Sequence, residues 1–436
     1  MKYIVSPGGE LRGELRPPSD KSISHRAVLL AALANGDSEI HHALLGEDVC
    51  STIAAVRACG VDIQEDNGRL LVKGCGTLSS PAAEVHCGNA GTLMRLFCGV
   101  AAGWDIDARL VGDESLMRRP MRRVTEPLAQ MGARISAAAD GCPPVLVSSG
   151  GRLQGITHTL PMASAQVKSA LLLAGLRAEG ETTVIEPEKS RDHTERMLEV
   201  FGAPPRREKL KTTVVGGVNL SPARVNVPAD LSSAAFFMVG AAIAPNSELV
   251  LKEVGINPTR YGIIELLRRM GAQIDVLNPR QIGAEPAADL RIVGSELRGI
   301  SIEAADVPTA IDDFPALFIA AAAARGETRL SGAAELRHKE SDRIAAMVDG
   351  LQTLGVGCEA TDDGVIIEGD GGQHEVFDGG DVDSHGDHRI AMALAMAALR
   401  ARKNITVRNC RNVATSFPNF AKKSTATGLR LAVQED

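Results

Sequence analysis

The sequence contains few aromatic residues, which make up 3% of its 436 residues and include a single tryptophan, Trp104. Its core must therefore be built mainly from the Ala, Leu, Ile and Val that contribute to its 44% hydrophobic content. Basic residues are also in deficit, because the net charge is −7. A protein that binds nucleic acid usually carries a basic excess and aromatic side chains for stacking bases. Both absences argue against a nucleic-acid partner.

The eight cysteines are scattered and form no CxxC pair, so neither a structural zinc site nor a disulfide framework is indicated. Long apolar runs are also missing. The longest, such as residues 316–324, are too short to span a bilayer. Residues 1–5 lead into Ser-Pro-Gly-Gly without the apolar core of a signal peptide. We therefore expect a soluble, cytoplasmic protein with reduced thiols, no metal and no membrane partner.

The sequence does contain an internal repeat. Six times, a glycine followed by an apolar residue closes an amphipathic helical pattern, as glycine does at the left-handed stop of a helix. These glycines are Gly60, Gly132, Gly202, Gly271, Gly355 and Gly428. They follow one another at intervals of 72, 70, 69, 84 and 73 residues. The regular spacing predicts six copies of one structural unit.

A second helical pattern, rich in Ala and Leu, precedes each closing helix. It begins at a side chain that can accept hydrogen bonds from the free N–H groups of a helix start. The predicted caps are Asp20, Asn89, Ser164, Asp230, Asp312 and Asp387. These helices should run about four turns, and because they are apolar nearly all round we expect them to be buried. The unit reads strand, buried helix, strand, exposed helix, strand.

Six such units exceed one hydrophobic core, so the sequence predicts an α/β protein of two domains with three units each. We expect the chain to cross between domains near residues 16–19, where Pro17-Pro18 excludes helix, and again near residues 227–230. One domain would then be discontinuous, comprising residues 1–17 and 229–436. The other would comprise residues 18–228.

Polar and cationic residues gather at the predicted starts of the buried helices in the first three units. The first start places Lys21 and Ser22 on the first turn and Arg26 on the same face as Ser22, an arrangement that suits a phosphate or carboxylate. The second offers backbone amides around residues 88–92, followed by four arginines within residues 118–123. The third carries Ser164-Ala165-Gln166 and, later, residues 191–195. The alternative is capped helices with ordinary basic surface patches.

The stretch 337–343, Arg-His-Lys-Glu-Ser-Asp-Arg, carries the chemistry of the fifth unit. We expect it to end a loop and open a helix, with Lys339 and Arg343 four residues apart on one face and Glu340 between them. Such cations could hold the carboxylate ionised or prime it for proton transfer. Asp312 in the same unit could share the acid and base work. The alternative is a charged helix start with surface ion pairs.

If three units point these helix starts toward a common end of each domain, two facing ends would focus positive potential in a cleft. Such a cleft suits small, highly charged substrates. The sixth unit would contribute His388 and Arg389.

With these residues assembled, the chain resembles the enolpyruvyl transferases, and among them the 5-enolpyruvylshikimate-3-phosphate synthase family. The resemblance extends from residues 17–22 to residues 414–418. Its signature consists of residues 88–92, 337–343 and 387–389. It implies two inverse, inside-out α/β domains that are barrel-like, each of three βαβαβ-type repeats, with the active site in the interdomain cleft.

The resemblance also implies a reaction and its residues. The enolpyruvyl group of phosphoenolpyruvate would pass to the 5-hydroxyl of shikimate 3-phosphate through a tetrahedral adduct that eliminates phosphate, without cofactor or metal, in a monomer. Shikimate 3-phosphate would be held by Lys21, Ser22, Arg26, Ser164, Ala165, Gln166, Arg191, Asp312 and Lys339. Phosphoenolpyruvate would be held by Lys21, Asn89, Gly91, Arg119, Gln166, Arg343, His388 and Arg389. Asp312 would take the hydroxyl proton, while Glu340, with Lys21 nearby, would move the proton at the methylene carbon.

Three positions bear on how far the resemblance holds. Thr415 stands where many relatives carry a lysine that faces phosphate, and Glu335 stands where some carry an asparagine. Gly91 favours sensitivity to glyphosate, because an alanine methyl there would narrow the phosphoenolpyruvate pocket.

Other functions stay open. One is the sister transferase that uses UDP-N-acetylglucosamine, which typically has Lys-Asn at positions 21 and 22 and a reactive cysteine in the arginine loop. Residues 112–119 contain no cysteine. Another is a non-catalytic scaffold that binds anions, and a third is an RNA-end-processing enzyme of related repeat architecture.

Overall fold

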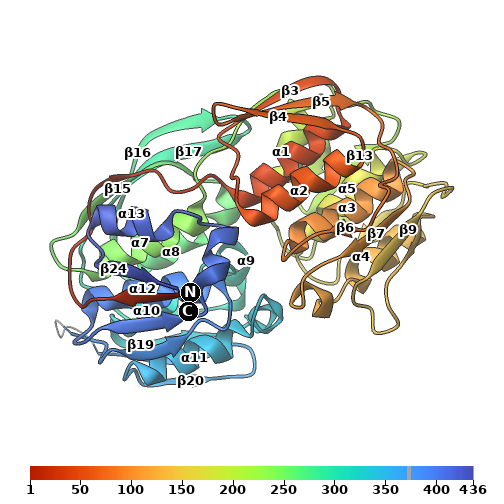
Figure 1. Cartoon of the computed structure of the whole chain (residues 1–436). Coiled ribbons are helices and arrows are strands. Elements are labelled where there is room, and N and C mark those ends of the chain that lie inside the picture. The colour runs from red at the N-terminus through yellow and green to blue at the C-terminus, as the bar shows by residue number, and fades with distance from the viewer. Residues whose placement is uncertain (371–374, 436) are drawn as a thin grey trace. The chain divides into compact units, whose positions relative to one another are not determined.

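The computed structural model of the chain describes residues 1–370 and 375–435. Its contacts divide the chain into two compact units (Figure 1). Unit 1 comprises Met1–Pro18, Ala229–Arg280 and Pro286–Asp436, and unit 2 comprises Ser19–Pro228 and Gln281–Glu285. Within the described ranges, no helix has both the length and the apolar character needed to cross a membrane. That the units correspond to domains with the expected boundaries stays a prediction.

Each unit contains three copies of one βαβαββ arrangement, and every copy forms a four-stranded sheet. The first two strands of a copy are parallel, and the second strand pairs antiparallel with the fourth. In four copies the buried helix links the first two strands, but in the first and fourth copies the first strand comes from a distant part of the chain. The sequence pattern therefore predicted the helices and three strands of each copy correctly but missed the fourth strand. In the first copy the sequence Asn67-Gly68 is typical of a tight hairpin turn and could have indicated this strand. In the structure the two residues have the left-handed φ angles of such a turn, 49° and 78°.

Unit 2 contains the first three copies. The first comprises α1 (Lys21–Leu33), β3 (Asn35–His41), α2 (Glu47–Ala58), β4 (Asp62–Asp66) and β5 (Arg69–Cys75). The second comprises β6 (Val85–His86), α3 (Gly91–Gly103), β7 (Ala108–Val111), η1 (Leu116–Arg118), α4 (Arg122–Gln130), β8 (Arg134–Ser136) and β9 (Val145–Ser148). The third comprises β10 (Thr157–Thr159), α5 (Ala165–Gly175), β11 (Glu181–Ile185), α6 (His193–Val200), β12 (Arg206–Glu208) and β13 (Lys211–Val215). Strand β14 (Arg224–Asn226) returns to pair in parallel with β3 and completes the first sheet.

Unit 1 contains the other three copies. The fourth comprises β2 (Arg12–Leu15), α7 (Leu231–Ile243), β15 (Glu248–Gly255), η2 (Pro258–Arg260), α8 (Gly262–Arg269), β16 (Gln273–Ile282) and β17 (Glu285–Val293). The fifth comprises β18 (Ser301–Ile302), η3 (Ala304–Asp306), α9 (Val307–Ala310), α10 (Phe314–Ala322), β19 (Arg325–Leu330), η4 (Ala334–His338), α11 (Arg343–Thr353), β20 (Cys358–Ala360) and β21 (Val365–Asp370). The sixth comprises β22 (Gly380–Asp383), α12 (His388–Ala397), η5 (Ala398–Arg400), β23 (Ile405–Arg408), η6 (Cys410–Thr415), α13 (Phe420–Thr427) and β24 (Leu431–Gln434). Strand β1 (Lys2–Val5) pairs antiparallel with β23 and β24, so both chain ends meet in this sheet (Figure 1).

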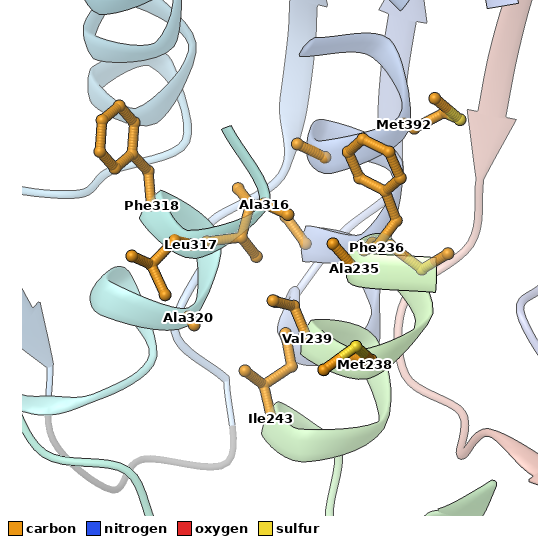
Figure 2. Packing of buried hydrophobic residues seen from close by; sticks show 14 of the residues in the cluster. Ala235, Phe236, Met238, Val239, Ile243, Ala316, Leu317, Phe318, Ala320 and Met392 are labelled. Carbon is orange, nitrogen blue, oxygen red and sulfur yellow. The ribbon is translucent and has the colours of Figure 1, made fainter. Parts of the chain in front are cut away.

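The buried helices form the centre of each unit, as their all-round apolar pattern predicted. Figure 2 shows Val239 of α7, Ala316 and Leu317 of α10 and Met392 of α12 within the core of unit 1. Each fully buried Val, Leu or Phe side chain contributes roughly 1.5–3 kcal/mol to stability. In unit 2, a Cβ on Gly99 of α3 would lie 2.1 Å from a carbonyl oxygen of α5, so only glycine permits this packing. The α/β class with helices inside and sheets outside is confirmed for each unit.

Four predicted helix caps are confirmed, and two are displaced by one residue. Asp20, Ser164, Asp230 and Asp387 each accept a hydrogen bond from a backbone N–H of the first helical turn. Helix α3, however, follows Ala90 instead of Asn89, whose side chain is bound elsewhere. Helix α10 follows Asp313 instead of Asp312 and has Pro315 in its first turn, where proline is tolerated.

The expected length of about four turns is too long for α5, α10 and α12, which have 11, 9 and 10 residues. All six closing glycines are confirmed. Each has a left-handed φ, between 78° and 119°, at the end of its exposed helix.

Candidate active site

The starts of α3 and α5 meet in unit 2 through Gln166. Its Nε2 donates to Thr92 Oγ1 over 3.0 Å, and its Oε1 accepts from Arg95 Nη1 over 2.8 Å. The structure therefore brings two predicted anion-binding helix starts together. We call their residues, with those at the start of α1, the unit 2 cluster. The predicted site residues in it are Lys21, Ser22, Arg26, Asn89, Gly91, Arg119, Ser164, Ala165, Gln166 and Arg191.

Gly91 lies directly against two guanidinium groups. A Cβ at this position would be 2.8 Å from Arg95 Nη1 and 3.2 Å from Arg119 Nη1. Arg119 donates from Nη2 to Asn89 Oδ1 over 2.8 Å, and Asn89 donates in turn to Asp113 Oδ2 over 2.7 Å. A bare helix start beside two ordered guanidinium groups is an arrangement that binds carboxylate or phosphate.

The start of α1 carries the cations Lys21 and Arg26, and Arg26 lies on the same helical face as Ser22, as predicted. Arg26 Nη1 donates to the Ser22 carbonyl oxygen over 3.0 Å. The pKa of Arg26 is lowered to about 10, mainly by burial. The charge of Glu195 opposes this effect and the charge of Arg191 adds to it. Lys21 Nζ lies 2.8 Å from Asp48 Oδ2, so this predicted catalytic lysine is ion-paired.

Unit 1 contains a second group of predicted site residues, the unit 1 cluster, at the starts of α10, α11 and α12. The predicted members are Asp312, Lys339, Glu340, Arg343, His388 and Arg389, and Asp387, which was expected only as a helix cap, joins them. Arg343 lies at its centre with its side chain 1% exposed. Burial lowers the pKa of Arg343, but the charges of Asp387, Glu340 and Asp312 outweigh burial and raise it above its ordinary value. Arg343 is therefore a permanent buried cation.

The guanidinium of Arg343 contacts three carboxylates. Nη2 donates to Glu340 Oε2 over 2.6 Å, Nε donates to Asp387 Oδ2 over 2.8 Å, and Nη1 donates to Asp312 Oδ1 over 3.4 Å. The two carboxylates predicted to share proton transfer thus lie on one cation. This arrangement can place an acid and a base on the same small ligand.

The prediction that Lys339 and Arg343 share one helical face is wrong. Lys339 follows η4 in an extended conformation, and α11 begins only at Arg343, after the cap Asp342. Lys339 Nζ nevertheless lies 3.9 Å from Asp312 Oδ1. Burial lowers the pKa of Lys339, while Asp312 and then Glu335 raise it. The segment reaches the cluster as a turn between two helices, not as a helix.

The start of α12 joins the same cluster. Arg389 Nη1 donates to the Asp312 carbonyl oxygen over 2.8 Å and lies 3.7 Å from Asp313 Oδ1. Burial raises the pKa of Asp313, an effect that Arg389 and Arg260 oppose. His388 is the first residue of α12 and is buried.

Thr415 bonds within its own turn. Its hydroxyl donates to the Asn412 carbonyl oxygen over 2.7 Å, and the side chain is buried in η6. Asn412 Nδ2 donates to the Gly386 carbonyl oxygen over 2.5 Å, which ties this turn to the start of α12. Lys423 donates to the Arg16 carbonyl oxygen, and Lys422 is exposed.

Several partners in these clusters were missed from the sequence. Asp387 was expected only as a cap, although it lies inside a motif that was singled out. Asp48 and Asp113 gave no signal, since they follow Lys21 and Asn89 by 27 and 24 residues. Among the described residues, no group of His, Cys, Asp and Glu could hold a metal ion. The cations instead suit anionic ligands.

Comparison with known proteins gives one consistent result. Residues 5–424 match the family model described as EPSP synthase (3-phosphoshikimate 1-carboxyvinyltransferase). The chain is 56% identical over 434 residues to the 3-phosphoshikimate 1-carboxyvinyltransferase of Methylococcus capsulatus, covering 99% of this chain and 98% of the relative. It is also 56% identical to the protein of that name from Halorhodospira halophila, covering 99% and 97%.

Solved structures agree. EPSP synthase from Acinetobacter baumannii is 49% identical, with a TM-score of 0.90 and full coverage of both chains. The enolpyruvyl transferase NikO from Streptomyces tendae is 19% identical, with a TM-score of 0.77 over 99% of this chain and 98% of its own. That more distant likeness shows the fold alone. Since a family model matches nearly the whole chain and relatives share more than half of its residues, the chain belongs to the EPSP synthase (3-phosphoshikimate 1-carboxyvinyltransferase) family.

Proposed function

We propose that this protein transfers the enolpyruvyl group of phosphoenolpyruvate to the 5-hydroxyl of shikimate 3-phosphate and releases phosphate. The observation that carries the proposal is the placement of Asp312 and Glu340 on the single guanidinium of Arg343. The chain that carries both carboxylates belongs to a family that is named after this reaction. Both units would supply residues to the two substrates.

The cations would bind the anionic groups of the substrates. Shikimate 3-phosphate would contact Ser22, Arg26 and Arg191, together with the start of α5 at Ser164, Ala165 and Gln166. Phosphoenolpyruvate would contact Arg119 and Asn89 beside Gly91. Arg343, His388 and Arg389 would complete its site. Guanidinium groups bind carboxylate and phosphate oxygens in pairs, which also fixes their orientation.

The proton transfers would be divided between the two carboxylates. Asp312 would accept the proton of the 5-hydroxyl as its oxygen attacks C2 of phosphoenolpyruvate, while a proton carried by Glu340 or Lys21 is added to C3. The resulting tetrahedral adduct would lose phosphate from C2 as the Glu340 carboxylate, with Lys21 nearby, takes a proton from C3, and this restores the enol ether. A cationic centre that develops at C2 would be stabilised by the adjacent carboxylates.

A phosphate-release assay tests the proposal. Purified protein receives phosphoenolpyruvate with shikimate 3-phosphate, with UDP-N-acetylglucosamine, or with neither. Release that requires shikimate 3-phosphate supports the proposed reaction. Release only with the nucleotide sugar would assign the sister activity. A protein that binds both ligands but releases no phosphate in any of the three assays would be a scaffold.

We further propose that the protein acts as a cytoplasmic monomer on these two small molecules, without a nucleic-acid, membrane or cofactor partner. The net charge of −7 supports the exclusion of nucleic acid. Sedimentation at equilibrium, with and without both substrates, should give the mass of one chain. A mass of two chains would contradict the monomer.

A further inference from the structure

Arg26 is held by hydroxyl groups from two other helices of unit 2. Nε donates to Thr194 Oγ1 on α6 over 2.6 Å, and Nη2 donates to Ser169 Oγ on α5 over 3.0 Å. Thr194 and Ser169 are each 1% exposed, so water does not stand in for either hydroxyl. With the bond from Nη1 to Ser22, the guanidinium is fixed through all three of its nitrogen atoms.

The direction of these hydrogen bonds follows from the available donors. Ser169 Oγ lies 2.6 Å from the Ala165 carbonyl oxygen and 2.7 Å from Thr194 Oγ1. A carbonyl oxygen only accepts, so the single hydroxyl proton of Ser169 goes to Ala165. Thr194 must then donate to Ser169. Both hydroxyl oxygens are left to accept from Arg26, and the bonds run from Arg26 to the first turn of α5.

A buried ion cluster fixes the positions of the Ser169 and Thr194 hydroxyl groups relative to each other. Lys168 on α5 places Nζ 2.8 Å from Glu195 Oε1 on α6 and 2.7 Å from Glu186 Oε2. Lys168 and Glu195 are the chain neighbours of Ser169 and Thr194, so this ion pair joins α5 and α6 beside the hydroxyl pair. Breaking such a buried pair is costly, which makes the geometry rigid.

The remaining donors of Arg26 are available to a ligand. A guanidinium has five N–H groups, and three are used by Ser22, Ser169 and Thr194. In the part of the chain that the structure describes, the other two have no hydrogen-bond partner. They lie on Nη1 and Nη2, the nitrogen atoms that bind oxyanions in pairs.

We propose that Thr194 and Ser169 are positioning residues that aim the guanidinium of Arg26 at an oxyanion of the acceptor substrate. Neither touches the substrate, and both act through Arg26. The inference rests on the proposed function, because shikimate 3-phosphate is the acceptor there. It assigns acceptor affinity to two buried hydroxyl groups in the interior of unit 2.

Steady-state kinetics of Thr194→Val test this role. Valine keeps the shape but removes the acceptor for Arg26 Nε–H. We expect KM for shikimate 3-phosphate to rise about tenfold or more. KM for phosphoenolpyruvate and kcat should stay within about twofold, and Thr194→Ser should restore KM. The matched control is Thr182→Val, a buried threonine of the same unit whose Oγ1 has no hydrogen-bond partner in the described structure.

Two results would overturn the positioning role. One is a Thr194→Val enzyme with the kinetics of the Thr182→Val control. The other is an equal rise in KM for both substrates together with a loss of kcat, which indicates general damage. If Thr194→Val does not fold, Ser169→Ala takes its place with the same expected split and the same overturning results.

A second measurement is independent of turnover. The Nε–H signal of Arg26, assigned by its loss in Arg26→Lys, is followed by NMR in isotope-labelled protein. Its exchange with solvent should be at least about tenfold faster in Thr194→Val than in wild type or Thr182→Val. Unchanged exchange would overturn the inference even in an active enzyme. A wild-type protein that releases no phosphate would instead refute the proposed function alone.

Discussion

Arg343 donates from Nη2 to Oε2 of Glu340 over 2.6 Å, and the two residues lie three positions apart where the chain enters α11. The arginine is buried while the side chain of Glu340 is 22% exposed. The carboxylate therefore rests on a fixed positive charge and still has a face open to solvent. A proton-transfer group needs both features, a defined position and access to the reacting atom.

Glu340→Gln should abolish most of the activity without unfolding the protein. Glutamine retains an acceptor oxygen for Arg343 but cannot carry the proton. We expect kcat for phosphate release to fall by about 10³, with the Kd for shikimate 3-phosphate within about threefold of wild type. Stopped-flow phosphate detection and calorimetric titration measure the two quantities. The control is Glu359→Gln, an exposed carboxylate on β20, and a normal kcat for Glu340→Gln would contradict the assigned role.

Asp387→Asn should be far more destabilising than Asp342→Asn. Both aspartates cap a helix and bind an arginine, and asparagine caps equally well, so each substitution removes mainly charge. Asp387 is fully buried against Arg343, and its loss should cost about 3 kcal/mol. The side chain of Asp342 is 37% exposed, and its loss should cost less than about 1 kcal/mol. Urea unfolding gives both free energies, and equal losses would refute the difference.

Gly91→Ala should weaken inhibition by glyphosate more than it weakens substrate binding. The added methyl would press on Arg95 Nη1 and Arg119 Nη1, which must shift by a few tenths of an ångström. A longer inhibitor should tolerate the narrower site less well than phosphoenolpyruvate. We expect a wild-type enzyme that is sensitive and an inhibition constant that rises at least about tenfold more than KM for phosphoenolpyruvate. Equal inhibition of the two forms would rule out this explanation.

Asp289 on β17 should make the stability of unit 1 depend on pH. Its carboxylate accepts hydrogen bonds from Glu253 N, Lys252 Nζ, Arg280 Nη2 and Asn278 Nδ2, at 2.8 to 3.3 Å. Burial raises the pKa of Asp289, but these bonds outweigh burial and hold the pKa well below its ordinary value. The folded pKa is then lower than the unfolded value of about 4. The stabilisation is therefore complete above about pH 4 and is lost as the pH falls toward the folded pKa.

Asp289→Asn should lower the free energy of unfolding by about 2 kcal/mol near neutral pH. The difference from wild type should narrow as the pH falls below about 4. Urea unfolding across this range measures it. The control is Asp275→Asn, which removes an exposed ion pair with Arg291 and should cost less than about 1 kcal/mol. A difference for Asp289→Asn that does not change on acidification would contradict the linkage.

Local sequence patterns were sufficient to predict the sixfold repeat. The closing glycines and the caps at Asp20, Ser164, Asp230 and Asp387 depend on a few neighbouring residues, so they can be recognised without a fold. The fourth strand of each copy was missed for the converse reason. Strand β13, for example, is Lys-Thr-Thr-Val-Val with three consecutive buried residues, so it has no apolar alternation to recognise.

The site was predicted as a set of residue types at helix starts, and the structure places those residues in one cluster per unit. That both clusters act on one pair of substrates stays a prediction. The non-helical path of Lys339 was also beyond local pattern. A run of charged residues is compatible with either a turn or a helix until its partners are present.

The sequence by itself determined the order of the helices and where most of the buried ones begin, because propensity, capping and apolar periodicity act over a few residues. Only the tertiary structure decided which charge meets which. Lys21 binds Asp48 27 residues away, Arg343 binds Asp387 44 residues away, and Arg26 binds Thr194 168 residues away. Such pairs form when the buried helices pack and exclude water from polar groups, which must then find partners inside the fold. The periodicity of the sequence therefore does not predict which of these distant residues pair.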